Sequence, residues 1–180
     1  MLIFQIAQKY RVFISAVLAV VLFYLARPTL SSILWGIPLV LFGEFIRTWS
    51  SGNIRKNKAL ATDGPYAYTR NPLYLGSFFI GTGFAVMAHS LVVFAVFTPA
   101  FFLIYWGVIR SEEWDLSRAF GPDFEAYVRN VPRFFPRLTR GAYGPGKFDW
   151  ALVWRHREYN AWMGIAAAVA ILFIKMTFQG

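Results

Sequence analysis

The sequence contains no cysteine, and only nine of its 180 residues are acidic, against eighteen that are basic. The absence of cysteine excludes disulfides, a thiol nucleophile and cysteine-ligated zinc or iron–sulfur centres. The two histidines, His89 and His156, have no metal-ligating company in the sequence, so we predict no metal site. Charged residues make up only 15% of the chain, whereas soluble domains average roughly 25%. The low charge therefore argues against a soluble globule.

Apolar residues take the place of the missing charge. The chain is 57% hydrophobic and 19% aromatic. A helix of about 20 apolar residues crosses the hydrocarbon of a bilayer. Five stretches approach that length, namely 12–26, 30–49, 72–88, 91–109 and 162–178. We therefore predict an all-α integral membrane protein with about five transmembrane helices.

The net charge of +9 is distributed unevenly between these stretches. Sixteen of the eighteen basic residues precede the first stretch or lie in segments 47–70 and 110–157, and only Arg27 and Lys175 fall on the opposite side. Positively charged segments stay in the cytoplasm. We predict a bacterial or archaeal inner-membrane protein whose N-terminus and segments 50–71 and 110–161 are cytoplasmic. The charge then reports topology and not nucleic-acid binding.

Turn residues divide the second predicted cytoplasmic segment, 110–161, into shorter elements. We expect short helices over 112–119 and 124–130, because Gly121-Pro122 breaks the pattern between them. Residues 131–136 predict an extended turn that lies along the membrane. Within the apolar part, Glu44 is costly in lipid, and Arg47 three residues later is its expected partner.

Stretches 72–88 and 91–109 predict a tight hairpin around His89-Ser90. The start of the first helix, at Asn71, then lies beside the end of the second, which Glu112 and Glu113 extend. A helix start is electropositive and a helix end electronegative. Such a pair suits a zwitterion with additional positive charge, such as S-adenosylmethionine, on the cytoplasmic face.

Two structural alternatives apply to the same residues. Asn71-Pro72 is also a favoured way to begin a helix. Glu113 has the spacing to pair with Arg110. Adjacent helical residues point about 100° apart, so we expect only one of Glu112 and Glu113 to face a pocket.

The sequence also resembles a known family. Residues 64–76, GPYAYTRNPLYLG, are similar to the GPYxYxRHPxYxG signature of the isoprenylcysteine carboxyl methyltransferase family. A second segment of that family follows in the same order, as Glu112-Glu113, Phe120-Gly121, Tyr127 and Val131-Pro132. The resemblance covers residues 55–136 and implies a membrane methyltransferase that uses S-adenosylmethionine. It implies cofactor contacts at Leu60, Ala61, Tyr66, Asn71, Pro72, Tyr74, Glu112 and Glu113.

Two positions depart from the family pattern. The family histidine is Asn71 here, as in the related phospholipid N-methyltransferases, and asparagine excludes a titrating base at this position. The substrate-binding arginine of the prenylcysteine enzymes corresponds to Val108, with Arg110 two residues later as a candidate substrate-binding residue. We assign no catalytic base.

These observations predict methyl transfer to a lipophilic, membrane-embedded acceptor, which carries a carboxylate, an amine or a thiol. Membrane lipid and this acceptor are the expected partners. The alternative is a non-catalytic membrane module of the same fold that binds lipid or a protein partner. We expect an N-terminal hairpin over 1–49, a methyltransferase core over 50–137, and a loop with a final helix over 138–180.

Overall fold

The computed structural model describes residues 16, 19–21, 23–55 and 59–179. Throughout this described part the regular elements are helical, which confirms the all-α prediction. The elements beyond residue 29 are α2 (Leu30–Ser51), the short 3₁₀ helix η1 (Gly64–Ala67), α3 (Pro72–Met87), α4 (Leu91–Phe120), α5 (Pro122–Asn130), α6 (Trp150–Arg155) and α7 (Tyr159–Gln179). Of the predicted first stretch, residues 12–15, 17–18 and 22 lie outside the described part.

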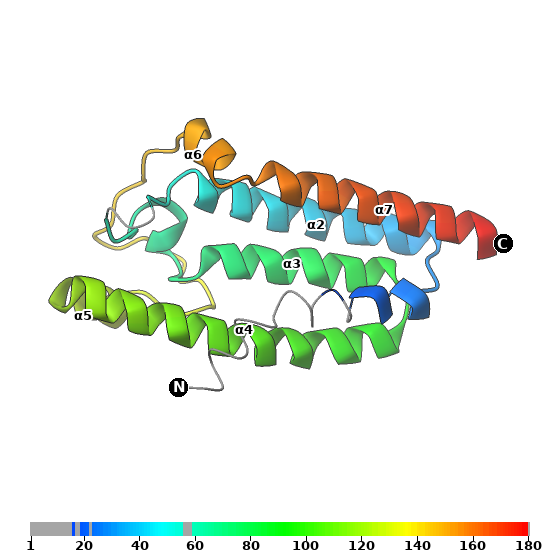
Figure 1. Cartoon of the computed structure of the whole chain (residues 1–180), viewed down its shortest axis with the longest axis horizontal. Coiled ribbons are helices and arrows are strands. Elements are labelled where there is room, and N and C mark those ends of the chain that lie inside the picture. The colour runs from blue at the N-terminus through cyan, green and yellow to red at the C-terminus, as the bar shows by residue number, and fades with distance from the viewer. Residues whose placement is uncertain (1–15, 17–18, 22, 56–58, 180) are drawn as a thin grey trace.

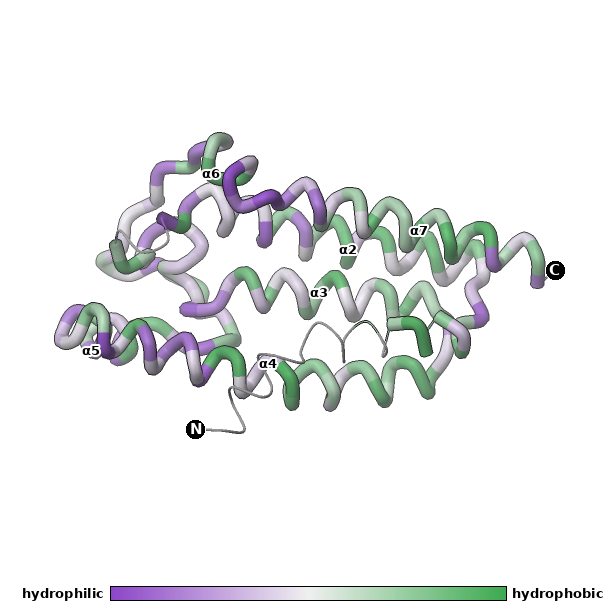
Figure 2. Tube along the Cα trace, viewed as in Figure 1, coloured by the Kyte–Doolittle hydropathy of each residue, from purple (hydrophilic) through white to green (hydrophobic). Residues whose placement is uncertain are grey.

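The long helices lie side by side, with α3 between α2 and α4 and with α7 next to α2 (Figure 1). The predicted hairpin is present, because α3 ends at Met87 and α4 begins at Leu91. His89 turns the chain with a φ of 47°, and the Ser90 side chain accepts a hydrogen bond from Val93 N to cap α4. Hydrophilic residues gather at the end of the bundle where α3 begins, and the other end is mostly apolar (Figure 2).

Helix α4 is longer than the sequence analysis predicts. It runs without a break from Leu91 to Phe120, so the separate helix expected over 112–119 is wrong. No residue between the apolar stretch and the acidic pair interrupts the helical hydrogen bonds. The helix ends only at Gly121, whose φ of 48° and ψ of −120° suit glycine alone. As a result α4 extends about 16 Å past Ile109, at 1.5 Å per residue, and carries Glu112 and Glu113 on a rigid support.

Helices α2 and α3 are held in close contact by four glycines. Gly36 and Gly43 of α2 lie opposite Gly83 and Gly76 of α3, respectively. A Cβ atom added at Gly76 would lie 2.6 Å from the Gly43 carbonyl oxygen, and one at Gly83 would lie 2.9 Å from the Gly36 carbonyl oxygen. Small residues allow backbones to approach in this way in membranes, where van der Waals packing drives helix association.

The chain is an integral membrane protein by its helices and its relatives, which are described below. Within the part of the chain that the structure describes, three helices, α2, α4 and α7, are long and apolar enough to cross a bilayer. Helix α3 is apolar but has only 16 residues. Among the described residues of α7 only Leu172 is buried, so most of this helix faces outward from the chain. These four helices correspond to the last four predicted stretches.

The glycine contact predicts a specific pattern of destabilisation. Gly76→Ala should lower the stability of the detergent-purified protein by about 1–3 kcal/mol, because the added methyl group overpacks two facing backbones. Gly164→Ala in α7 is the matched control, since its Cβ would meet nothing within 4 Å. Thermal unfolding of both variants measures the difference. Equal unfolding temperatures for the two variants would contradict the packing described here.

Candidate functional site

The segment from Ala67 to Asn71 is tied to a distant piece of chain, residues 131–137, which we call the strap. Arg70 N donates to the Pro132 carbonyl at 2.9 Å, and Thr69 Oγ1 donates to the Phe134 carbonyl at 3.0 Å. Arg137 Nε donates to the Ala67 carbonyl at 2.9 Å. The strap begins extended at Val131, as predicted. Its backbone therefore closes over the residues that precede α3.

Asn71 occupies the position before α3, but its side chain does not cap the helix. Its Nδ2 instead donates to the Arg133 carbonyl at 2.9 Å, which adds a further bond to the strap. The helix-start alternative therefore explains the position of Asn71 and Pro72 in the chain but not the use of the asparagine amide. Both residues are buried.

The two adjacent glutamates of α4 bind different partners. Tyr74 Oη donates to Glu112 Oε1 at 2.6 Å. Glu113 instead forms ion pairs with Arg70 at 3.2 Å and with Arg133 at 2.8 Å. The different directions of the two side chains agree with the expected 100° offset. Glu113 thus joins α4 to both the segment before α3 and the strap.

The pairing of Glu113 with Arg110 is wrong, because the Glu113 carboxylate binds Arg70 and Arg133 instead. Arg110 is exposed, and its guanidinium carbon is 5.4 Å from the centre of the Trp106 ring. The same ring lies 5.2 Å from the guanidinium carbon of Arg133. Arginine is attracted to aromatic faces at this distance. Arg110 is therefore held at the outer surface, away from the Tyr74–Glu112 pair.

Three buried polar atoms next to these pairs have no hydrogen-bond partner among the described residues. They are the Tyr66 hydroxyl and two guanidinium nitrogens of Arg70, Nε and Nη1. Buried polar groups are nearly always satisfied, so each such atom calls for a partner. The side chains of Tyr66 and Arg70 are only 5% and 8% exposed. Together with Tyr74 and Glu112, Tyr66 and Arg70 form a buried polar cluster with unused hydrogen-bonding atoms, which we call the polar site.

Burial also determines the protonation state of the tyrosines in and beside the polar site. Desolvation raises the pKa of Tyr66, and the nearby Tyr127, Glu112 and Tyr74 raise it further. Burial likewise raises the pKa of Tyr127, whose hydroxyl donates to the Tyr66 carbonyl at 2.8 Å. Both phenols therefore stay neutral hydrogen-bond donors at physiological pH. For Arg70 desolvation lowers the pKa, while the charge of Glu113 opposes that shift.

Apolar side chains form one wall of this region. Phe124, Tyr127 and Val131 make a buried cluster, against which Leu60 packs. Ala61 follows Leu60 and is half-buried. Leu60 thus lies next to Tyr127, whose hydroxyl binds the η1 backbone, although the two residues are far apart in the sequence.

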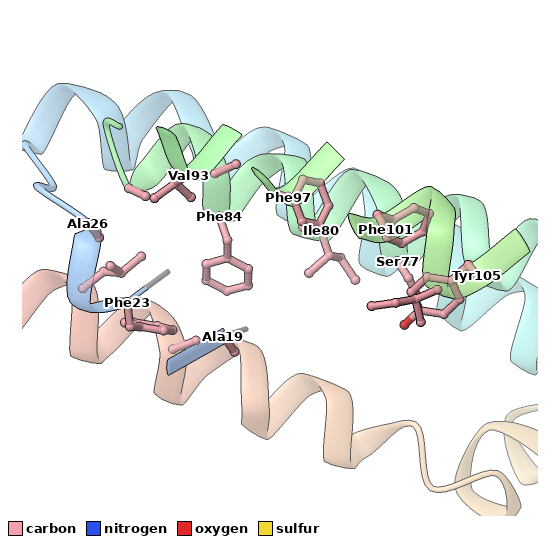
Figure 3. A pocket seen from close by; sticks show the side chains of 16 residues that line it. Ala19, Phe23, Ala26, Ser77, Ile80, Phe84, Val93, Phe97, Phe101 and Tyr105 are labelled. Atoms are coloured by element: carbon pink, nitrogen blue, oxygen red, sulfur yellow. The ribbon is translucent and has the colours of Figure 1, made fainter. Parts of the chain in front are cut away.

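A cavity of about 350 Å³ runs along the apolar part of the bundle (Figure 3). Its walls include Ile80 and Phe84 of α3 and Phe97 of α4. At one end it reaches Ser77 and Tyr105. The Tyr105 ring lies 5.1 Å from the Tyr74 ring, so the cavity ends next to the residue that binds Glu112.

Arg70 and Tyr127 lie inside the matched segments, but no role was predicted for either, and Arg133 was not predicted as a site residue. Arg70 carried a usable signal, because an arginine directly before a helix start in an apolar chain needs an acidic partner. Arg133 and Tyr127 act through contacts with residues more than sixty positions away along the chain or on another helix. Spacing along the chain does not encode such contacts.

The fold and the site define a helical membrane protein with a buried polar site at the hydrophilic end of its bundle. The chain belongs to the phospholipid methyltransferase family, whose model matches residues 14–123. The resemblance to isoprenylcysteine carboxyl methyltransferases is confirmed by relatives of that name.

Three relatives illustrate the range of similar proteins. The cobalt-zinc-cadmium resistance protein CzcN of Cupriavidus metallidurans is 40% identical over 72% of this chain and 63% of its own length. The protein-S-isoprenylcysteine O-methyltransferase of Schizosaccharomyces pombe is 33% identical over 46% of this chain and 35% of its own length. The methanethiol S-methyltransferase of Crocosphaera subtropica is 37% identical over 42% of this chain and 28% of its own length.

The chain spans less than two thirds of the length of these relatives. No solved structure matches it. The family and the two relatives named as methyltransferases support methyl transfer in general, and these two names specify different acceptors.

The ion pairs of Glu113 predict that the acidic pair contributes unequally to stability. Glu113→Gln should destabilise the protein by about 2–3 kcal/mol, because it leaves Arg70 and Arg133 without a counter-charge. The loss is somewhat smaller than for a fully buried pair, because Arg133 is partly exposed. Glu112→Gln should change stability little, since a glutamine oxygen still accepts from Tyr74. Asp115→Asn, an exposed site on the same helix, controls for the lost charge. A lower unfolding temperature for Glu112→Gln than for Glu113→Gln would contradict this assignment.

Proposed function

We propose that the protein transfers a methyl group from S-adenosylmethionine to a lipophilic acceptor in the membrane. The observation that carries this proposal is the polar site, in which Tyr66 and Arg70 present buried polar atoms without described partners beside Glu112. We propose that these residues line a pocket for the cofactor. An apolar cavity ends at Tyr105, which packs against Tyr74 at the edge of the same pocket. A polar site joined to an apolar cavity suits a charged cofactor and a lipophilic acceptor.

The side chains around the pocket fit the charges of this cofactor. Arg70 offers unpaired N–H donors for a carboxylate, and charge-assisted bonds of this kind are strong. Glu112 offers a carboxylate for an ammonium group, since Tyr74 uses only part of its accepting capacity. Glu113 is committed to two arginines, so we propose that Glu112 holds the ammonium group while Glu113 positions Arg70.

The remaining predicted cofactor residues surround these charges. Leu60 and Ala61 supply apolar surface for the adenosyl part, and Asn71 and Pro72 bring the electropositive start of α3 to the pocket. We propose that the ring of Tyr66 or of Tyr74 faces the sulfonium, because aromatic faces attract cations. When bound, the cofactor supplies an electrophilic methyl group on that sulfonium.

The protein's own contribution to the reaction is positioning and exclusion of water. Phe134 of the strap packs in one buried cluster with Leu75 of α3 and Phe101 of α4, and we propose that the strap and α5 cover the bound cofactor. Orientation of two reactants and removal of solvent account for large rate effects. We assign no base, because Asn71 cannot titrate and the buried tyrosines stay protonated. The acceptor nucleophile is a carboxylate, an amine or a thiol, and Arg110 beside Trp106 remains the candidate for binding an acceptor charge.

We further propose that residues 50–137 form the catalytic core, between a hairpin over 1–49 and a final segment over 138–180. The five-span topology, with the pocket in the cytoplasm of a bacterial or archaeal cell, rests on the basic residues at the hydrophilic end. Leu138 is 97% exposed at that end. A cysteine introduced there, in a chain that has none of its own, should react with an impermeant reagent only after the cells are broken. Labelling in intact cells would reverse the orientation.

Cofactor binding distinguishes this enzyme from a non-catalytic module of the same fold. Calorimetry of the detergent-purified chain should detect binding of S-adenosylmethionine and S-adenosylhomocysteine. Glu112→Gln should weaken binding by about 1.5–3 kcal/mol, the value of a charge-assisted bond. Tyr66→Phe should weaken it by about 0.5–1.5 kcal/mol without loss of stability, because its hydroxyl has no described partner to lose.

Asp115→Asn serves again as the control and should bind like the parent. A parent chain that binds neither molecule would favour the non-catalytic alternative. If the parent binds both molecules and Glu112→Gln binds them equally well, the protein uses this cofactor but Glu112 does not hold it. Methyl transfer from labelled cofactor to a membrane lipid extract then tests the reaction itself.

A further inference from the structure

Exposed aromatic and basic side chains gather where the chain enters α7. We call this group the α6 patch, and its members are Phe148, Trp150, Trp154, Arg155 and Arg157. The two tryptophans lie four residues apart on one face of α6 and are each 57% exposed. Leu152 and Val153, on the opposite face, are buried against the rest of the protein. Helix α6 therefore buries an aliphatic face and exposes an aromatic face.

The aromatic rings of the patch continue into α7. The ring centres of Phe148 and Trp150 are 5.0 Å apart. Trp154 lies 5.6 Å from Tyr159 and 6.0 Å from Trp162, which belong to the first turn of α7. A chain of aromatic rings thus leads from a polar loop into a helix that is long enough to cross a membrane.

The patch lies beside the end of α2 and the start of α7, two helices that are candidate membrane spans. His156 Nδ1 is 3.1 Å from the carbonyl oxygen of Ser51, the last residue of α2. Tyr159 is the first residue of α7. Both helices are candidate spans, so the patch sits at the level of the lipid headgroups. Tryptophan and tyrosine are enriched at this level.

The positive charge of the patch is not neutralised within the part of the protein that the structure describes. Arg155 and Arg157 are exposed, and neither forms an ion pair with a described residue. The neighbouring Glu158 is buried and bound to Arg47 at 2.6 Å. Asp149 accepts a hydrogen bond from Ala151 N at 2.8 Å and caps α6. Glu158 is therefore already paired, and Asp149 lies at the opposite end of α6 from the two arginines.

We propose that the α6 patch binds the phosphate headgroup of an anionic phospholipid of the membrane that the chain spans. The two arginines donate to the phosphate, and the tryptophans pack at the boundary between headgroup and acyl chain. A soluble acidic partner fits less well, because the exposed tryptophans would then have to leave the lipid. The proposal does not depend on methyl transfer, since no residue of the patch contributes to the pocket of Tyr66 and Arg70.

The test compares lipid binding by the full-length, detergent-purified protein in native mass spectrometry, with phosphatidylglycerol and phosphatidylcholine as probes. Arg155→Gln combined with Arg157→Asn removes the charge, and asparagine tolerates the φ of 56° at position 157 better than most residues. Arg118→Gln combined with Arg129→Gln removes the same charge from exposed positions on α4 and α5. Thermal unfolding in phosphatidylcholine checks that each variant is folded.

The parent should bind phosphatidylglycerol more tightly than phosphatidylcholine. The patch variant should lose about fivefold in affinity for phosphatidylglycerol per arginine removed, and the α4–α5 variant should keep the parent affinity. Equal binding of the two lipids by the parent would overturn the proposal, as would equal losses in both double variants, which indicate a diffuse charge effect. If the double patch variant does not fold, the single variants Arg155→Gln and Arg118→Gln are compared instead. Only Arg155→Gln should then lose affinity for phosphatidylglycerol, and equal losses would overturn the proposal.

Discussion

The guanidinium of Arg70 is buried between three segments of the chain, and the site depends on how its charge is balanced. Glu113 of α4 supplies the counter-charge and also binds Arg133 of the strap. An unpaired buried charge is far more costly than an exposed one. The ion pairs therefore fix the relative position of the segment before α3, the end of α4 and the strap. The same pairs leave two nitrogens of Arg70 without a described partner, which is what makes this buried charge available to a ligand.

The transmembrane part of the protein provides a fixed frame for this arrangement. The glycines of α2 and α3 bring the two backbones into contact, and the α3–α4 hairpin places the start of α3 next to the far end of α4. Because α4 continues as one helix to Phe120, its glutamates stand on a rigid support beyond the apolar region. A break in α4 at residue 110 would have left the acidic pair on a loop. The uninterrupted helix is thus the feature that connects membrane packing to the geometry of the pocket.

Much of this could be predicted from the sequence, because apolar length and turn residues act locally. Helices α2, α3 and α7 match predicted stretches within a few residues, and the hairpin at His89-Ser90 follows from its short polar turn. Helix α4 begins where predicted but continues past residue 109 to Phe120. The Glu44–Arg47 pair is present at 3.9 Å, yet Arg47 binds Glu158 more closely, at 2.6 Å. Glu158 lies 111 residues away, so local spacing could not reveal it. The partners of Glu113 and the course of the strap escaped prediction for the same reason.

The central claim is that the segment around η1 and the end of α4 with the strap form one cofactor site. Hydrogen–deuterium exchange of the detergent-purified protein, with and without S-adenosylhomocysteine, tests it most directly. The account predicts slower exchange in both residues 60–76 and residues 112–137 when the ligand is present, and unchanged exchange in α6 and in the first turn of α7. Protection confined to other parts of the chain, or to only one of the two segments, would contradict it.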